Sequence, residues 1–192
     1  MEKPGDIRLL QFYLEQDARW NLSPQCAYLE YRLRSWAQHF LRPPLDILNV
    51  GIGAGLWDDY LGYLLDGQGT LTSVDRDAEI CELFRYRQAR ERHPAPARVI
   101  CADVLGDEIE TEFDAVTLIG STATELGPHG EVLAAAARRV RSGGMLFYSD
   151  DAASHPAERF RQLCPALGLE VRGFEEDRRL NLPFYLFVAA RA

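Results

Sequence analysis

The sequence predicts an α/β fold built on a doubly wound, mostly parallel sheet. Three observations support this prediction. An apolar run over residues 45–50 reads as a buried strand and breaks into a glycine-rich turn. A second β-rich run, residues 71–74, ends in Asp75, about 20 residues beyond that turn. Segments with helical spacing then alternate with strand-like runs as far as Tyr148, which is typical of parallel strands connected by helices.

The residues before the first strand predict two helices. They are expected over 6–20 and 24–41, and Ser23 suits the N-cap of the second because its hydroxyl can accept from the first free backbone N–H groups. We therefore expect a helical cap over residues 1–44 and a core over residues 45–192. The chain of 192 residues predicts that both belong to one domain.

The glycine-rich turn precedes a helix expected over residues 56–65. A strand, such a turn and a helix form the corner of a doubly wound fold that binds a nucleotide. The turn has glycines at alternate positions, Gly51, Gly53 and Gly55. A dinucleotide fingerprint instead reads G-x-G-x-x-G. The spacing therefore argues against a nicotinamide dinucleotide.

This turn and four later segments together resemble the class I S-adenosylmethionine (SAM)-dependent methyltransferases. The segments are the turn itself, which is similar to motif I, the strand ending in Asp75, the strand 99–103 ending in Asp103, the "FDAV" run at 113–116, and the helix end, Gly-Gly pair and strand at 137–148. They follow the family's order over residues 45–150. The resemblance implies a Rossmann-like, seven-stranded, mostly parallel sheet with helices on both faces, an N-terminal helical cap and one antiparallel strand near the end.

The resemblance also implies a cofactor, SAM, and a product, S-adenosyl-L-homocysteine (SAH). The glycines would let the backbone approach the adenosine and the methionine part. Asp75 would accept hydrogen bonds from the ribose hydroxyls, and Asp103 with the backbone N–H of Val104 would meet the adenine. The other residues assigned to the cofactor are Arg76, Ile119 and Gly120. Each carboxylate also suits a simpler role as a helix cap or turn residue.

One position departs from the family pattern. The residue two before the first glycine is usually Asp or Glu and helps to hold the methionine ammonium, whereas this chain has Asn49. Asn accepts a hydrogen bond through its carbonyl oxygen but brings no charge. Three readings stay open: weaker SAM affinity, a compensating acid among Asp46, Asp58 and Asp59, or a chain that no longer transfers methyl groups.

The substrate is expected outside the carboxyl ends of the strands, where open α/β sheets bind their ligands. His155, after the fifth strand, is the candidate general base, since O-methylation requires proton removal and imidazole titrates near neutral pH. Asp150 or Asp151 would orient it, and His129 is a second candidate. The alternative is that His155 is an exposed residue in the first turn of a helix. The side chains expected to contact the acceptor are Tyr13, Trp20, Ser121 and Glu125. No metal is expected, although the pair Asp150-Asp151 leaves a divalent-metal site open.

Composition limits the partners. A net charge of −8 argues against a broad phosphate-binding face for nucleic acid. The arginines at 85, 87, 90 and 92 are expected to form a solvated helix face. The chain shows neither a signal-peptide pattern nor an apolar run of membrane-spanning length, so we expect a cytoplasmic protein with no membrane partner. The helical cap is as suited to a homodimer interface as to closing the site.

We therefore expect an enzyme that moves a methyl group from SAM to an oxygen or nitrogen atom of a small-molecule acceptor. Three alternatives stay open. An enzyme of the same fold would use SAM for cyclisation or aminopropyl transfer and yield no methylated acceptor. A SAM-binding accessory protein or pseudoenzyme would bind SAM without turnover. A nicotinamide-dependent oxidoreductase would bind NADH tightly.

Overall fold

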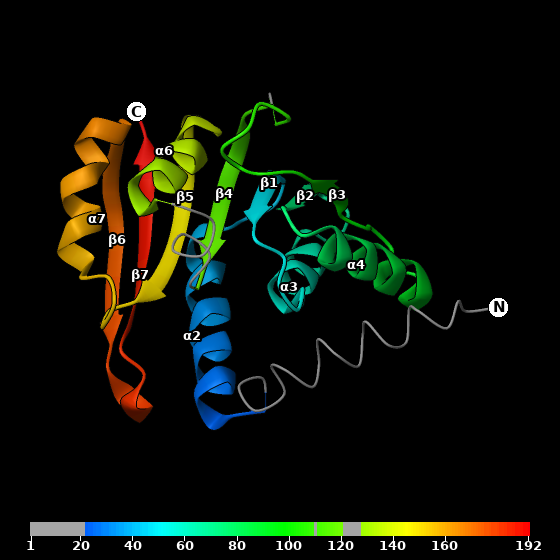
Figure 1. Ribbon diagram of the computed structural model, residues 1–192, viewed down its shortest axis with the longest axis horizontal. Helices are drawn as coiled ribbons and strands as arrows, with labels where there is room; N and C mark the ends of the chain where they lie inside the picture. The colour runs from blue at the N-terminus through cyan, green and yellow to red at the C-terminus, as the bar shows by residue number, and fades with distance from the viewer. Residues whose placement is uncertain (1–21, 110, 121–127) are drawn as a thin grey trace.

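A seven-stranded sheet separates two layers of helices in the part of the chain that the structure describes (Figure 1). The computed structural model describes residues 22–109, 111–120 and 128–192. The strands are β1 (Leu45–Val50), β2 (Gly69–Asp75), β3 (Arg98–Cys101), β4 (Phe113–Ile119), β5 (Val140–Asp151), β6 (Leu169–Asp177) and β7 (Phe184–Arg191). The α-helices are α2 (Pro24–Phe40), α3 (Leu56–Leu65), α4 (Ala78–Glu91), α6 (His129–Arg138) and α7 (Ala157–Leu163), and two short 3₁₀ helices are η1 (Cys164–Leu167) and η2 (Arg179–Asn181).

The strand order is β3-β2-β1-β4-β5-β7-β6. β1 pairs in parallel with β2 and β4, β2 with β3, and β4 with β5, whereas β7 runs antiparallel to both β5 and β6. These pairings confirm the predicted fold, including its one antiparallel strand. The chain moves outward in one direction from β1 to β3 and in the other from β4, so the order reverses between β1 and β4. Ligands of open α/β sheets bind at such a switch point.

Helices cover both faces of the sheet. Successive side chains of a strand point to opposite faces, so neighbouring residues of one strand pack against different helices. In β1, Ile47 packs in a cluster with Leu61 of α3 and Leu33 of α2. Its neighbour Leu48 packs in the opposite cluster with Val132 of α6. α2, from the expected cap, thus lies on the same sheet face as α3. The helix expected over residues 6–20 lies outside the described residues.

Local signals place most helix ends where the sequence predicts them. The Ser23 hydroxyl accepts from the Cys26 N–H at 3.1 Å, as an N-cap residue should. The Gly143–Gly144 pair differs from the expected turn, because it lies inside β5 where the pairing with β4 shifts register. A Cβ on Gly144 would come within 2.8 Å of the Asp114 carbonyl oxygen, so glycine is required at this close approach.

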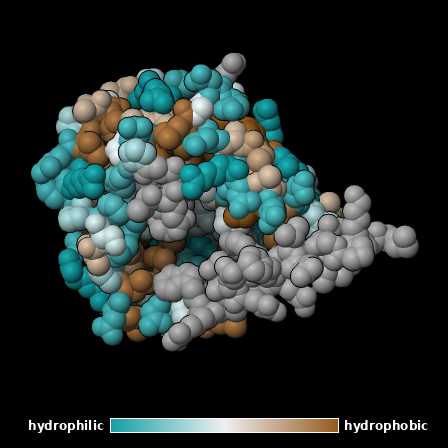
Figure 2. Space-filling model, viewed as in Figure 1, coloured by the Kyte–Doolittle hydropathy of each residue, from teal (hydrophilic) through white to brown (hydrophobic). Residues whose placement is uncertain are grey.

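The described surface in Figure 2 is mostly hydrophilic, with apolar side chains showing in smaller patches. Among the described residues, Leu22 and Tyr63 are two of the large apolar side chains that are exposed. Within residues 22–109, 111–120 and 128–192, no helix combines the length and apolar character needed to cross a bilayer.

Candidate functional site

The glycine-rich turn joins β1 to α3 at the switch point. Gly51, Gly53 and Gly55 have φ angles of 84°, 52° and 73°, the left-handed region that other residues rarely adopt. A Cβ on Gly55 would also lie 2.5 Å from the Arg87 guanidinium. Backbone conformation and crowding therefore both require glycine at the N-cap of α3. The turn presents the start of α3 at the carboxyl edge of the sheet.

Asp75 holds this turn from the neighbouring strand. One carboxylate oxygen accepts from the Ile52 N–H at 2.8 Å, and the other accepts from the Asp77 N–H at 2.9 Å. The residue is 9% exposed. Each carboxylate oxygen has two lone pairs, so both retain capacity to accept from a ribose hydroxyl. The ribose contact stays a prediction. The bond to Asp77 is the turn role that the sequence left as an alternative, whereas the bond to Ile52 was not predicted.

Arg87 of α4 holds the turn from the other side. Its guanidinium donates to the carbonyl oxygens of Ala54 (2.6 Å) and Gly55 (3.1 Å) and to Asp59 (2.8 Å). The expectation of a wholly solvated arginine face is therefore wrong for Arg87. The available signal was its spacing three residues after Phe84, which places both on the buried side of α4.

The other residues predicted to contact the cofactor lie along the same edge of the sheet. Asp103 accepts from the Leu105 N–H at 2.9 Å, which is the turn geometry that the sequence left as an alternative. The Val104 side chain is buried in the core. Gly120, at the end of β4, has φ 77° and donates its N–H to the Ser149 carbonyl at 3.0 Å. Arg76 is exposed and Ile119 is half-buried.

A row of polar side chains lies beneath the turn, on the sheet face that α3 covers. Asn49 pairs in register with Ser73 of β2 and Thr117 of β4. The Thr117 hydroxyl donates to the Asn49 Oδ1 at 2.7 Å. The Asn49 amide donates to the Gly51 carbonyl and to the Asp58 Oδ1, both at 2.9 Å, and Asp58 also accepts from Ser73 at 2.5 Å. This network ties the first glycine of the turn to a carboxyl group on α3.

Asp58 alone among the three expected compensating acids contacts Asn49. Asp46 lies at the amino end of β1, and Asp59 forms an ion pair with Arg87. Asp58 is 1% exposed, and this burial raises its pKa to about 7, although its hydrogen bonds act in the opposite direction. The network therefore holds a carboxyl group that changes charge near neutral pH.

A second polar cluster forms around the end of β5. Asp150 Oδ2 lies 3.6 Å from His155 Nδ1 and 3.8 Å from His129 Nε2, and it accepts from the Tyr148 hydroxyl at 2.7 Å. The two imidazole rings stack with their centroids 4.6 Å apart. His155 precedes α7 and its side chain is only 12% exposed, so it differs from the exposed first-turn residue of the alternative reading. Asp151 instead accepts from loop groups of Ala153 and Ser154.

Burial shifts the pKa values of His129 and Asp150 in this cluster. Desolvation, followed by repulsion from His155, lowers the pKa of His129 to about 4, so the ring is neutral at pH 7. Because Tyr148 gives its one proton to Asp150, the His129 Nε2–H donates to the Tyr148 oxygen at 2.8 Å. Burial also raises the pKa of Asp150. A neutral imidazole thus lies beside a carboxyl group whose ionisation is disfavoured by burial.

The same three groups are the ones in the described residues that come closest to a metal site. His129, Asp150 and His155 each offer an atom within 4.8 Å of the others. However, the planes of the imidazole rings differ by only 3°, so their in-plane lone pairs do not converge on one point. A metal ion would require one ring to turn. The arrangement as it stands suits proton sharing, and the absence of a metal stays a prediction.

Four predicted acceptor contacts, Tyr13, Trp20, Ser121 and Glu125, lie outside the described residues. The part of the site that would contact the acceptor is therefore defined here only by the ends of β4 and β5.

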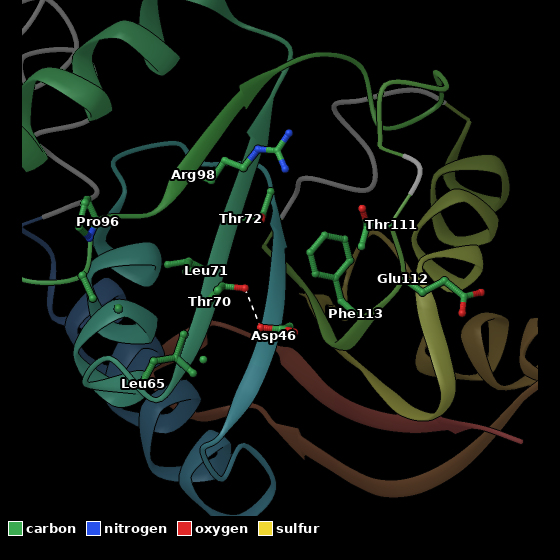
Figure 3. Close-up of a pocket in the computed structure, with 13 residues that line it drawn as sticks. Asp46, Leu65, Thr70, Leu71, Thr72, Pro96, Arg98, Thr111, Glu112 and Phe113 are labelled. Atoms are coloured by element: carbon green, nitrogen blue, oxygen red, sulfur yellow. Dashed lines mark hydrogen bonds between the residues drawn. The ribbon is translucent and has the colours of Figure 1, made fainter.

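A cavity of about 340 Å³ lies at the opposite edge of the sheet (Figure 3). Asp46, Thr70, Arg98 and Phe113, from the amino ends of four strands, contribute to its lining. Figure 3 shows the hydrogen bond of 2.7 Å between Thr70 and Asp46. Parallel sheets bind their ligands at the carboxyl edge, so this cavity is not part of the candidate site.

Comparison with protein families matches residues 47–144 to a family described as "Methyltransferase domain". The match covers most of β1, the glycine turn, β2 to β4 and the start of β5. Comparison with curated protein sequences finds no match.

Solved structures of similar fold include three of distinct activity. N-methyltransferase NodS from Bradyrhizobium japonicum WM9 has a TM-score of 0.69 at 14% identity, over 89% of this chain and 98% of that one. Magnesium protoporphyrin IX methyltransferase from Synechocystis PCC 6803, with bound SAM, has a TM-score of 0.68 at 10% identity. The alignment covers 100% of this chain and 86% of that one. The [4+2]-cyclase SpnF has a TM-score of 0.69 at 14% identity, over 83% of this chain and 80% of that one. At these identities the likeness shows the fold.

Proposed function

This chain belongs to the methyltransferase domain family, and we propose that it transfers a methyl group from SAM to an oxygen or nitrogen atom of a small-molecule acceptor. The observation that carries the proposal is the glycine turn at the switch point of the sheet, held by Asp75 on one side and Arg87 on the other. The Synechocystis structure contains SAM, and a NodS structure contains SAH, within the same fold.

The described residues fit such a cofactor. Three glycines with positive φ leave the turn without side chains, so a ligand can approach its backbone closely. Asp75 retains lone pairs for the ribose hydroxyls, and the end of β3 brings Asp103 to the same edge for the adenine. Asn49 and Asp58 lie under the turn on the side of α3. When bound, SAM supplies an activated methyl group on a sulfonium.

The protein's own contribution is alignment and proton removal. The glycine turn, held by Asp75 and Arg87, would bind the donor and so align its methyl group with the acceptor. His155 takes the acceptor's proton through its ring, and Asp150, 3.6 Å from Nδ1, orients that ring and stabilises the charge it gains. His129 stays neutral beside it, because burial keeps its pKa at about 4. The His129 ring is therefore a poor acceptor for the proton that leaves the substrate.

Calorimetric titration of the purified protein with SAM, SAH and NADH tests the cofactor. We expect micromolar affinity for SAM and SAH and no binding of NADH. Absence of binding for both sulfur compounds would refute the proposal, and tight NADH binding would favour the oxidoreductase alternative.

Product analysis separates methyl transfer from other uses of SAM. Methyl transfer releases SAH, aminopropyl transfer releases methylthioadenosine, and a cyclase that uses SAM only as a structural ligand leaves it intact. The cyclase alternative is included because SpnF shares this fold. We expect SAH with a methylated small molecule, in a protein that works in the cytoplasm.

A further inference from the structure

Asp58 is a buried acid without a positive partner. The residue is 1% exposed, and its Oδ2 atom has no hydrogen-bond partner among the described residues. Its Oδ1 accepts from the neutral side chains of Asn49 and Ser73, and a backbone N–H of Asp58 itself also acts on the carboxyl group. Across the described part of the chain no Lys, Arg or His is seen to form an ion pair with it, and another acid, Asp59, acts on it by charge repulsion.

Such an arrangement is costly unless a charge partner arrives. A buried carboxylate that lacks a cation is strongly destabilised relative to its protonated form. The first turn of α3 offsets part of this cost, because the positive end of a helix dipole favours a negative group there. The remaining cost would be removed by a proton or by a cation that binds close to the network. The protein supplies no such cation among its described residues.

Hydrogen bonds connect Asp58 to the glycine turn, where the cofactor is proposed to bind. Asn49 connects the two, since its amide donates both to Asp58 Oδ1 and to the carbonyl oxygen of Gly51. Gly51 is the first glycine of the turn. The Thr117 hydroxyl fixes the orientation of the Asn49 amide by donating to its oxygen. A change of charge on Asp58 is therefore transmitted to the turn through one oriented side chain.

We propose that Asp58 is a positioning residue for a cationic ligand: acting through Asn49 and the Gly51 carbonyl, it makes the glycine turn selective for the charged methionine part of the cofactor. This inference rests on the proposed function, because SAM carries both an ammonium and a sulfonium. It also accounts for Asn49: the carboxylate that the family usually has at this position of β1 is supplied by Asp58 of α3 instead.

The titration of Asp58 gives the proposal its signature. The other charged groups near it are Asp59, on the same turn of α3, and Arg87 of α4, which is paired with Asp59. β1 and β2 contribute only the neutral Asn49 and Ser73. Bound SAM favours ionised Asp58, so SAM affinity rises as the pH increases through about 7 and is weaker below it.

The experiment measures affinity by calorimetry between about pH 6 and pH 8 for SAM, SAH and 5′-methylthioadenosine, which carries neither the ammonium nor the sulfonium. For the unmodified chain we expect SAM affinity to rise by about tenfold over this range and methylthioadenosine affinity to stay constant. Asp58→Asn should remove the rise. A change confined to SAM assigns the effect to the sulfonium, and a change shared with SAH assigns it to the ammonium.

Two variants serve as matched controls. Asp46→Asn makes the same chemical change at the amino end of β1, and SAM affinity should keep its pH dependence. The exchange Asn49→Asp with Asp58→Asn moves the carboxylate onto β1, and we expect it to restore SAM affinity lost in Asp58→Asn. Circular dichroism and thermal melting check that each variant is folded.

A measurement on the unmodified chain needs no variant. Titrations with SAM at pH 7, in buffers of different ionisation enthalpy, give the number of protons exchanged on binding, and we expect release of a fraction of one proton. No proton release together with a pH-independent affinity would overturn the inference. So would an equal loss of SAM and methylthioadenosine affinity in Asp58→Asn, which is the mark of a purely structural role. A chain that binds neither SAM nor SAH at any pH would instead refute the proposed function itself.

Discussion

Individual carboxyl groups in this site act on the backbone as much as on a ligand. Asp75 accepts from two backbone N–H groups, and Asp103 accepts from a third. Either carboxylate could be explained wholly by these turns. What distinguishes Asp75 is its target, since it bonds Ile52 inside the glycine turn and so couples the turn to the strand that would bind the ribose.

Replacing Asp75 by Ala tests its two roles together. We expect SAM affinity to weaken by about 1–3 kcal/mol, because ribose hydrogen bonds are lost and the turn loosens. Calorimetry measures the affinity, and thermal melting measures stability. Asp77→Ala is the control, since it removes the N-cap bonds of α4 to Glu79 and Ile80 but no bond to the glycine turn. If both variants lose SAM affinity equally, the ribose assignment is wrong.

His155 is the residue on which the proposed chemistry depends. His155→Gln should lower kcat by about 10²- to 10⁴-fold, the usual contribution of a general base, and leave SAM affinity unchanged. A methyl-transfer assay with an identified acceptor measures the first, and calorimetry the second. His93→Gln, which alters a ring packed on Tyr63, should retain full activity. Unchanged kcat in His155→Gln would remove His155 from the mechanism.

At the scale of elements, two helices hold the turn between β1 and α3. α3 begins directly after its N-cap residue Gly55. α4 contacts the turn through Arg87, which donates to two carbonyl oxygens and pairs with Asp59 on α3. The Arg87 side chain is 24% exposed, so these charge-assisted bonds are partly shielded from solvent. The position of α4 therefore affects the cofactor turn directly.

Arg87→Met tests this coupling while preserving much of the side-chain volume. We expect SAM affinity to fall by about 1–2 kcal/mol as the unpaired carbonyls of the turn rearrange. Arg85→Met is the comparison, because Arg85 donates to the Val99 carbonyl of β3 and makes no bond to the turn. Calorimetry measures the SAM affinity of both variants. If Arg87→Met binds SAM as tightly as Arg85→Met, α4 does not support the turn.

At the scale of the whole molecule, the buried imidazole of His129 links stability to pH. Its pKa is lowered from 6.5 to about 4 in the folded state, so protonation favours the unfolded chain. The neutral His129 ring contributes fully to the free energy of unfolding above about pH 6.5. This contribution, up to roughly 3 kcal/mol, is lost as the pH falls towards 4. Asp58 acts in the opposite sense, because burial raises its pKa.

A variant isolates the His129 contribution from the rest. Urea denaturation of the unmodified chain and of His129→Gln, at several pH values between about 4 and 7.5, gives the difference in free energy of unfolding. We expect that difference to shrink as the pH falls. Parallel curves for the two proteins would show that His129 is not the group responsible.

Much of the fold and part of the site could be predicted from the sequence, because they depend on local patterns. Glycines at alternate positions after an apolar run predicted the turn, and Ser23 predicted a helix start. The contacts of Arg87 and Asp58 could not be predicted, because each joins elements that are distant along the chain and meet only when the strands pair.

The sequence by itself determined the order of strands and helices, the family and the nucleotide-binding corner, since periodicity and glycine spacing are properties of short segments. Only the tertiary structure decided which acid lies beside Asn49 and that His129 stays neutral at pH 7. Both depend on burial and on contacts between separate strands, and desolvation exists only once the core has formed.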